Sequence, residues 1–424
     1  MNMINLIHNL LIIFIKFDRV FSMFENVSEV IFASVLYRHG DRTPVKPYPT
    51  DPYRNVSLWP VQWGQLTHIG KEQQFLLGQW LRQRYSNFLP SVYSELDIHI
   101  QSTDMDRTLM SAECNLAGLY LPVPQQRFNP EIRWQPIPVH TVPELEDYIL
   151  AAKKPCPRYS EEYERVENSP EMQIINKKNA PLYSYLTENA GMVIQTVTDV
   201  EYFYNTLFIE ELYNFTLPNW TKSVYPEKLK PLADFSFLLP TKTKILKKLK
   251  TGPLLGEITS NMMKKRNGAL TPDRKMFVYS CHDTTIANVL NTLGVFDAHS
   301  PPYTATVLIE LRLDATGKYY VVVEYHNTTG DPSVLQVPGC AELCPLDMFV
   351  KLTEEFVPKD WEKECHSLET SKDCTYATYD VLSIAIIASA MLGTCLLLLL
   401  VGSLVYWCLH QSEKTRYHRL HQDA

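Results

Sequence analysis

Residues 30–44 read VIFASVLYRHGDRTP, an apolar run that ends abruptly in a cluster of charged residues. The run over 30–36 is rich in β-branched and other apolar side chains, which predicts a buried strand. Arg38, His39 and Arg42 then follow the C-terminal end of that strand. Strands that are apolar throughout are typical of parallel sheets covered by helices, so this stretch predicts an α/β fold.

Two later segments repeat the same order of strand, polar cluster and helix. The strand-like run DIHIQS at 97–102 precedes a cluster that contains Arg107, and MFVY at 276–279 precedes His282 and Asp283. Apolar residues at helical spacing follow each cluster. Because the carboxyl ends of parallel strands meet at one edge of a sheet, we expect the three clusters to lie together.

The pooled side chains are three guanidinium groups, two imidazoles and one carboxyl group. Arginine matches the geometry of phosphate oxygens, and three converging arginines would repel one another without a bound anion. An imidazole among them can act as a nucleophile, and the cations beside it should keep it neutral below its usual pKa. With no glycine-rich phosphate loop and no complete set of metal ligands in the sequence, we expect phosphoryl transfer through a phosphohistidine, without a metal or a cofactor.

These residues resemble the signature of the histidine acid phosphatases. The resemblance starts from RHGxRxP at 38–44 and the distant pair His282-Asp283, and it covers nearly the whole chain before residue 380. It is strong for the lysosomal and prostatic members of the family, and for the membrane-anchored lysosomal type in particular. The other matching stretches are GQLT at 64–67, STDMDRT at 102–108, WQPIPVH at 134–140, PCPRY at 155–159, PGC at 338–340 and VPKDW at 357–361.

The resemblance implies an acid phosphatase that hydrolyses phosphate monoesters, with His39 as nucleophile and Asp283 as proton donor to the leaving alcohol. The implied phosphate-binding residues are Arg38, Arg42, Arg107 and His282. The implied fold is a phosphoglycerate-mutase-like parallel-sheet domain with a mainly helical cap inserted within about residues 125–265. The implied disulfides are Cys156–Cys365 and Cys340–Cys344.

Two alternatives stay open on the sequence alone. A membrane-bound binding ectodomain could use the same scaffold without catalysis, although the intact His39 and Asp283 argue against it. A narrower phosphatase for lipid phosphates or inositol phosphates could use the same core, and the residues of the cap would decide between these substrates.

Three local patterns refine the expected fold. The runs 306–313 and 319–325 flank DATG, which predicts a hairpin at an antiparallel edge of the sheet. The stretch GQLT at 64–67 predicts a turn and a helix cap. Asp104 or Asp106 is expected to cap the helix that follows it.

The two ends of the chain predict a single-pass membrane protein. The apolar run at 10–15 suggests a signal peptide over residues 1–22, and residues 381–409 contain no charged residue, which predicts a transmembrane helix over 381–405. Basic residues in the tail, 406–424, place it in the cytosol and the domain over 23–380 in the lumen. Five N-x-[ST] sequons support a luminal domain, at Asn26, Asn55, Asn214, Asn219 and Asn327.

The net charge of the chain and the sequence of its C-terminal tail indicate which partners to expect. The formal net charge of −7 gives no basic field for nucleic acid. The tail sequence YHRL has the form of a tyrosine sorting signal, with Tyr417 and Leu420 as the residues that a clathrin adaptor would bind. We therefore expect a lysosomal membrane protein that acts on phosphomonoesters, and we expect it to form a homodimer.

Overall fold

The computed structural model describes residues 29–366, 389, 391–407 and 409. The chain divides into a compact unit, residues 1–365, and a second unit, residues 366–424, whose described residues include a helix over 391–407. Among the described residues, no helix combines the length and apolar character needed to cross a membrane. The expected signal peptide, residues 381–388 of the expected span, Asn26, Tyr417 and Leu420 lie outside the described residues.

A mixed β-sheet forms the centre of the first unit, in the order β3-β2-β4-β1-β5-β6-β7, with β8 paired to β6. Its strands β3, β2, β4 and β1 run parallel, whereas β5, β6, β7 and β8 make antiparallel pairs. The strands are β1 (Val30–Arg38), β2 (Ile98–Thr103), β3 (His140–Val142), β4 (Met276–Cys281), β5 (Thr306–Leu313), β6 (Tyr319–His326), β7 (Ser333–Leu335) and β8 (Cys344–Pro345).

The sheet confirms the α/β class and corrects one detail of it. The expected hairpin is present as β5 and β6, but it does not form the edge, because β7 and β8 pair with the outer side of β6. Since β5 lies directly beside β1 and runs opposite to it, the sheet is mixed rather than parallel throughout.

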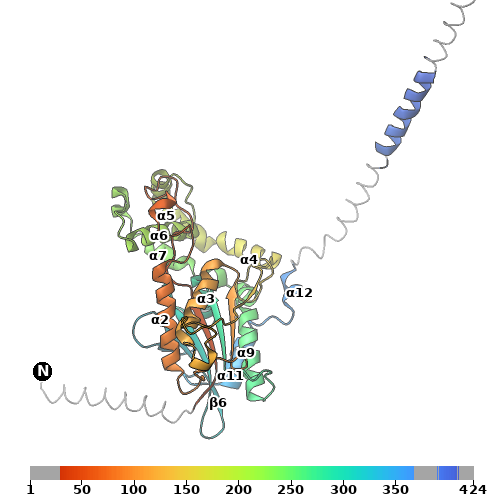
Figure 1. Cartoon of the computed structure of the whole chain (residues 1–424). Coiled ribbons are helices and arrows are strands. Elements are labelled where there is room, and N and C mark those ends of the chain that lie inside the picture. The colour runs from red at the N-terminus through yellow and green to blue at the C-terminus, as the bar shows by residue number, and fades with distance from the viewer. Residues whose placement is uncertain (1–28, 367–388, 390, 408, 410–424) are drawn as a thin grey trace, which may run out of the picture. The chain divides into compact units, whose positions relative to one another are not determined.

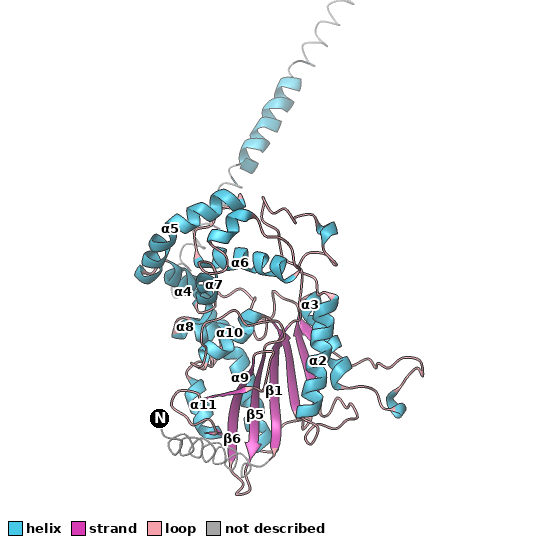
Figure 2. Ribbon diagram, turned by 90° about the vertical axis from the view of Figure 1, so that its left-hand side faces the viewer, coloured by secondary structure: helices cyan, strands magenta, loops and turns pink. Residues whose placement is uncertain are grey.

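Helices cover both faces of the sheet (Figure 2). Side chains of β1 alternate between the faces, so that Phe32 and Leu36 pack on one side and Val35 and Tyr37 on the other. The first face is covered by α9 (Gly252–Arg266), α10 (Asp283–Thr292) and α11 (Leu346–Glu354), and the second by α2 (His68–Arg84) and α3 (Asp106–Leu119).

The loop after β1 lies against the first turn of α2 at two glycines. A Cβ atom on Gly40 would lie 2.2 Å from the carbonyl oxygen of Gly70, and a Cβ atom on Gly70 would lie 2.2 Å from that of Asp41. Thr67 caps α2, because its hydroxyl accepts a hydrogen bond from the Gly70 N–H at 3.2 Å. The expected cap in GQLT is therefore confirmed, and the close approach explains why this loop needs glycine.

The expected aspartate cap of α3 is wrong. Met105 occupies the N-cap position without a side-chain hydrogen bond, and Asp106 is the first helical residue. Its carboxylate accepts a hydrogen bond from the Gln65 amide at 3.0 Å. Its negative charge in the first turn still stabilises the helix, because it lies near the positive end of the helix dipole.

Five helices between β3 and α9 gather at one end of the sheet, where Figure 1 labels α4 to α7. They form apolar clusters of their own, with buried residues such as Leu186, Phe203, Leu207 and Leu246. Their bounds are α4 (Pro157–Glu167), α5 (Pro170–Ala190), α6 (Val197–Leu212), α7 (Lys230–Ser236) and α8 (Lys244–Lys250). We call this group the cap.

The cap helices fall within the range expected for a helical insertion, about 125–265. Two other elements in that range, β3 and α9, belong to the sheet and its covering layer. Short 3₁₀ helices lie in the connecting loops, namely η1 (Val56–Leu58), η2 (Pro124–Gln126), η3 (Asn219–Ser223) and η4 (Leu239–Thr241).

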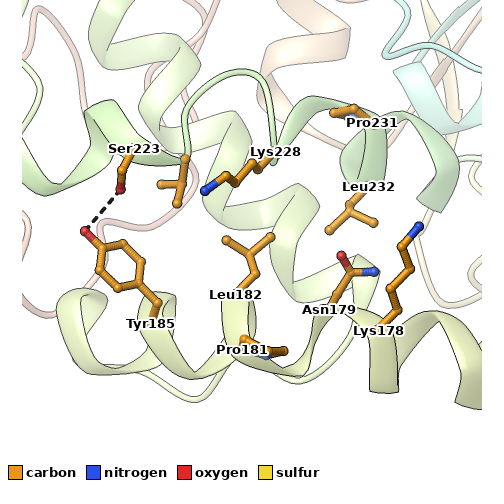
Figure 3. A pocket seen from close by; sticks show the side chains of 10 residues that line it. Lys178, Asn179, Pro181, Leu182, Tyr185, Ser223, Lys228, Pro231 and Leu232 are labelled. Carbon is orange, nitrogen blue, oxygen red and sulfur yellow. Dashed lines mark hydrogen bonds between the residues drawn. The ribbon is translucent and has the colours of Figure 1, made fainter.

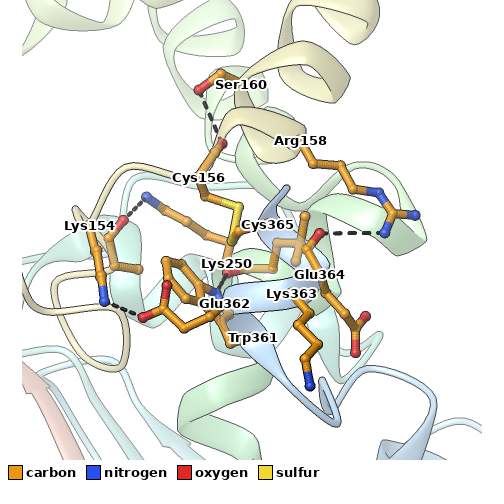
Figure 4. Close-up of a disulfide and its surroundings, with 12 residues drawn as sticks. Lys154, Cys156, Arg158, Ser160, Lys250, Trp361, Glu362, Lys363, Glu364 and Cys365 are labelled. Carbon is orange, nitrogen blue, oxygen red and sulfur yellow. Dashed lines mark hydrogen bonds and ion pairs between the residues drawn. A yellow bond between two sulfur atoms is a disulfide. The ribbon is translucent and has the colours of Figure 1, made fainter. Parts of the chain in front are cut away.

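Both implied disulfides are present in the structure. Cys340–Cys344 closes a short loop, whereas Cys156–Cys365 joins the start of α4 to α12 (Trp361–Cys365) across 209 residues of sequence. Around the second bond, the Trp361 indole donates a hydrogen bond to the Leu249 carbonyl oxygen at 2.9 Å, and Lys154 pairs with Glu362 (Figure 4). The end of the folded unit is thereby attached to the base of the cap.

Candidate active site

The three polar clusters meet at one edge of the sheet. Strand β4 pairs in parallel with both β1 and β2, so the C-terminal ends of these strands are neighbours. Arg38 is the last residue of β1, Arg107 is the second residue of α3, and Asp283 is the first residue of α10. The structure thus brings together side chains that are separated by more than two hundred residues of sequence.

His39 is buried at the centre of this cluster, with 2% of its surface exposed. Its Nδ1 lies 2.8 Å from the carbonyl oxygen of Gly40. Because a carbonyl oxygen can only accept a hydrogen bond, Nδ1 carries the proton and Nε2 keeps a free lone pair. Burial, followed by the charges of Arg38 and Arg107, holds the pKa of His39 well below its usual value. The imidazole is therefore neutral at acid pH, as expected from the sequence.

Arg38 connects His39's strand to the carboxyl group of Asp283. One guanidinium nitrogen lies 2.7 Å from the Asp283 carboxylate, and another donates to the Pro301 carbonyl oxygen at 2.6 Å. Burial raises the pKa of Asp283, but the charges of Arg38 and Arg42 outweigh burial and lower that pKa below its usual value. Asp283 is therefore ionised in the ligand-free protein.

The two other arginines approach from different elements. Arg42 donates to the Thr43 carbonyl oxygen and to the Asn205 amide oxygen of α6, both at 3.0 Å. Burial and then the charge of Arg42 lower the pKa of Arg107 to about 10, so Arg107 keeps its charge at acid pH.

His282 lies edge-on to His39, with 5.6 Å between the ring centroids. Its Nδ1 is 3.5 Å from an Arg107 nitrogen and its Nε2 is 3.0 Å from the Thr103 hydroxyl. Burial and then the charge of Arg107 lower the pKa of His282 to about 3. This second imidazole is neutral, with Nδ1 the acceptor that faces an arginine and Nε2 the donor.

The cluster carries a net positive charge suited to a phosphate dianion. Three guanidinium groups and one carboxylate leave two positive charges, while both imidazoles are neutral. Within the described part of the chain, the buried Nε atoms of Arg38, Arg42 and Arg107 have no hydrogen-bond partner. Buried donors of this kind require an acceptor, and phosphate oxygens would supply it.

The sequence did not point to Tyr303, which packs on two residues of the cluster. The Arg38 guanidinium carbon lies 4.3 Å from the centre of the Tyr303 ring, and the His39 and Tyr303 rings are 5.9 Å apart. Tyr303 lies just before β5, and β5 starts at the edge where the antiparallel β1 ends. The sequence carried no signal for Tyr303, because its place depends on the antiparallel pairing of β5 with β1.

Asp41 and Glu201 are two further acidic groups where this edge of the sheet meets the cap. The buried Asp41 carboxylate accepts hydrogen bonds from the Thr67 hydroxyl at 2.5 Å and from the Tyr213 hydroxyl at 2.6 Å. Glu201 lies on α6, four residues before Asn205, and the charges of Asp283, Arg42 and Arg38 act on it. No sequence pattern identified either residue, because both depend on how the cap meets the sheet.

Other chemically relevant groups lie apart from the cluster. A hollow of about 700 Å³ lies between α5 and residues 223–232 of the cap, and both apolar and polar side chains line it, Lys178 and Lys228 among them (Figure 3). It contains none of the residues above.

Cys281 is buried, and burial raises its pKa to about 12, so its thiol stays protonated. In the described residues, no group of three or more His, Cys, Asp or Glu side chains is arranged to hold a metal ion.

The four sequons in the described residues are exposed. These are Asn55, Asn214, Asn219 and Asn327. Exposure is what the attachment of a glycan requires.

Comparison with known proteins identifies relatives over most of the chain. Residues 29–326 match the family model described as the histidine phosphatase superfamily, branch 2. The chain is 39% identical to the lysosomal acid phosphatase of Rattus norvegicus over 92% of this chain and 90% of the rat protein. It is 38% identical to the prostatic acid phosphatase of Homo sapiens over 80% of this chain and 88% of the human protein.

Solved structures share the fold at lower identity. The phytase of Hafnia alvei in its apo form superposes with a TM-score of 0.61 at 20% identity, covering 80% of this chain and 98% of the phytase. The phytase of Citrobacter braakii gives a TM-score of 0.60 at 17% identity, over 80% of this chain and 99% of that enzyme.

Proposed function

Since the chain belongs to branch 2 of the histidine phosphatase superfamily and is a phosphatase, we propose that it hydrolyses phosphate monoesters at acid pH through a phosphohistidine on His39. The main support for this proposal is the protonation state of His39. Its Nδ1–H is held by the Gly40 carbonyl oxygen, which leaves a neutral Nε2 beside three arginines.

In the first step, the substrate phosphate binds to Arg38, Arg42 and Arg107. It also binds to His282, whose pKa the bound dianion raises, so that Nδ1 can take up a proton and donate to phosphate. The lone pair of His39 Nε2 forms a bond to phosphorus, and the bond from phosphorus to the leaving oxygen breaks. The three guanidinium groups stabilise the charge on the phosphoryl oxygens, which is the main demand of phosphoryl transfer.

Asp283 is proposed to donate the proton that the leaving alcohol needs. In the ligand-free protein its carboxylate is paired with Arg38. A bound phosphate dianion would compete for Arg38 and place negative charge near the carboxylate, and both effects raise the pKa of Asp283. Acid pH then supplies the proton, which passes to the leaving oxygen as the bond breaks.

In the second step, a water molecule replaces the leaving alcohol. Asp283, now a carboxylate, takes a proton from this water while the water oxygen bonds to phosphorus. The bond between phosphorus and His39 Nε2 breaks, and inorganic phosphate is released. The intact pair of His39 and Asp283 supports an active enzyme over a binding ectodomain.

The test is acid hydrolysis of p-nitrophenyl phosphate before and after treatment with a chelator. We expect the activity to persist after chelation, and we expect His39→Ala to abolish turnover. His68→Ala is the matched control, because His68 is exposed at the start of α2. Activity that disappears on chelation, or full activity in His39→Ala, would contradict the phosphohistidine pathway.

The proposal extends to the place of the enzyme in the cell. Residues 1–22 would be a signal peptide, 23–380 the luminal domain, 381–405 a membrane span and 406–424 a cytosolic tail, which gives a glycosylated lysosomal membrane protein. The charge-free run over 381–409, the exposed sequons and the name of the lysosomal relatives support it. Removal of N-glycans should lower the apparent mass.

The tail and the assembly are part of the same proposal. Tyr417→Ala should raise the fraction of the protein at the cell surface without changing specific activity, because an adaptor would no longer bind the tail. Unaltered delivery to lysosomes would show that Tyr417 has no sorting role. Sedimentation of the glycosylated ectodomain at twice the monomer mass would establish the homodimer.

A further inference from the structure

One carboxyl group of the cap, that of Glu201, belongs to the side of α6 that contacts Arg42. Glu201 and Asn205 are four residues apart on α6, so they lie on the same side of that helix. Asn205 contacts the Arg42 guanidinium at 3.0 Å, which directs this side of α6 toward the cluster. In Figure 2, α6 lies beyond the end of the sheet.

The charges around Glu201 belong to the active site. Asp283, Arg42 and Arg38 act on Glu201, and the titratable group beside it on α6 is the phenol of Tyr202. Burial and the negative charge of Asp283 raise the pKa of Glu201 to about 7, against the opposing charges of Arg42 and Arg38. Glu201 is therefore a neutral acid at the pH where an acid phosphatase works and a carboxylate above neutrality.

We propose that Glu201 is a specificity-determining residue whose charge state decides how well the site accepts a phosphate dianion. This inference rests on the proposed function, because it concerns the same phosphate site. With Glu201 neutral, three guanidinium groups and the Asp283 carboxylate leave two positive charges, which match the two negative charges of the ligand. With Glu201 ionised, one net positive charge is left and the dianion meets an additional repulsion.

The direction of the pH effect follows from linkage. A bound dianion raises the pKa of a nearby carboxyl group, so the protonated form of Glu201 binds phosphate more tightly than the ionised form. Each unit by which the dianion raises that pKa corresponds to roughly a tenfold difference in affinity between the two forms. The affinity of the site for the phosphate dianion should therefore decline as pH rises through about 7.

The experiment compares inorganic phosphate binding to the wild type and to Glu201→Gln between pH 5 and pH 8.5, by calorimetry. The ratio of the two dissociation constants is used at each pH, because the protonation of phosphate itself then cancels. We expect a ratio near one at pH 5, and roughly tenfold tighter binding to the variant at pH 8.5.

Three more variants make the result specific. Glu201→Asp keeps a titrating carboxyl group and should retain the decline with pH, whereas Glu201→Ala should behave as Glu201→Gln does and replaces it if the amide variant does not fold. Glu211→Gln is the control, since Glu211 lies on the same helix, is exposed and bonds to Tyr225. It should match the wild type at every pH.

Each outcome bears on one hypothesis. A ratio that stays constant with pH, in a wild-type protein that hydrolyses p-nitrophenyl phosphate, would overturn the role of Glu201 and leave the proposed function intact. A wild-type protein that binds phosphate with the expected pH dependence but does not hydrolyse the substrate would overturn the proposed function instead.

Discussion

Two buried carboxyl groups, Asp51 and Glu210, should make the protein less stable as pH rises. Asp51 lies in the segment between β1 and α2, and Glu210 lies on α6. Asp51 is 1% exposed and Glu210 is 0% exposed. Each carboxyl group acts on the pKa of the other. In the described residues, Asp51 Oδ2 and both carboxyl oxygens of Glu210 have no hydrogen-bond donor, and a proton held between the two groups would supply one. In the described part of the chain neither forms a salt bridge, so the pair has no cation to neutralise it.

Burial and the negative charge of Asp51 raise the pKa of Glu210 to about 9. The groups around the pair do not cancel these raised pKa values. The charge of Arg54 lowers the pKa of Asp51 less than burial raises it, and the nearby Tyr48 is a neutral phenol. In the unfolded chain a glutamate has a pKa of about 4.3. Between pH 5 and about pH 9, the folded protein therefore holds one proton that the unfolded chain has lost.

The magnitude follows from this one proton. When folding takes up a proton, the free energy of unfolding falls by about 1.4 kcal/mol for each pH unit. Between pH 5 and pH 7 this pair should therefore lower the free energy of unfolding by about 3 kcal/mol. For a folded unit of this length the entropy of unfolding is roughly 0.7 kcal/mol per kelvin, so the melting temperature should fall by about 4 °C from this cause alone.

Glu210→Gln tests this reasoning, because an amide has nearly the same shape and stays neutral at every pH. The introduced amide can donate to Asp51, which also accepts from the Tyr53 N–H at 2.6 Å. We expect equal melting temperatures at pH 5 and a melting temperature about 4 °C higher for the variant at pH 7. Glu188→Gln, on the exposed side of α5, is the control. A difference between wild type and Glu210→Gln that does not grow with pH would refute the shared proton.

Two further predictions concern catalysis. Asp283→Ala should lower kcat/KM for alkyl phosphates by roughly 10²–10⁴-fold and for nitrophenyl phosphate much less, because only a poor leaving group needs the proton. Equal losses in kcat/KM for both substrates would exclude the donor role. Tyr303→Leu removes the ring over Arg38, and a cation–π contact of about 0.5–2 kcal/mol predicts a loss in kcat/KM of roughly twofold to thirtyfold. Tyr303→Phe keeps the ring and should retain activity, so an equal loss in Tyr303→Phe would assign the effect to the hydroxyl group.

The strands that carry the active site could be predicted from sequence because each is a continuous apolar run. The runs 30–36, 97–102 and 276–279 match β1, β2 and β4 to within a few residues. Once these strands are parallel neighbours, the residues that follow them must share an edge. The order of the sheet could not be read in the same way, because nothing local in 306–313 says that this strand lies beside β1 with the opposite direction.

Residues whose roles depend on remote packing were not predictable. Glu201 and Asn205 lie on α6, a largely apolar helix whose sequence does not single out one polar face. The contact between Asn205 and Arg42 shows which side is turned toward the site. Asp51 and Glu210 lie far apart in sequence, with α2, β2, α3, β3, α4 and α5 between them, and each alone resembles an ordinary surface acid. Their burial follows from the way α6 closes over the loop after β1.

The disulfide Cys156–Cys365 also determines what a single protease cut can do. It turns the chain from 156 to 365 into a covalent ring, which contains His282, Asp283 and Glu201 but not His39 or Arg107. One cut in an exposed loop of the ring produces two polypeptides that are still joined through sulfur, so the two parts of the catalytic set cannot separate. A nicked molecule should run as one band without reductant and as two with it, and its activity should survive the cut until the disulfide is reduced.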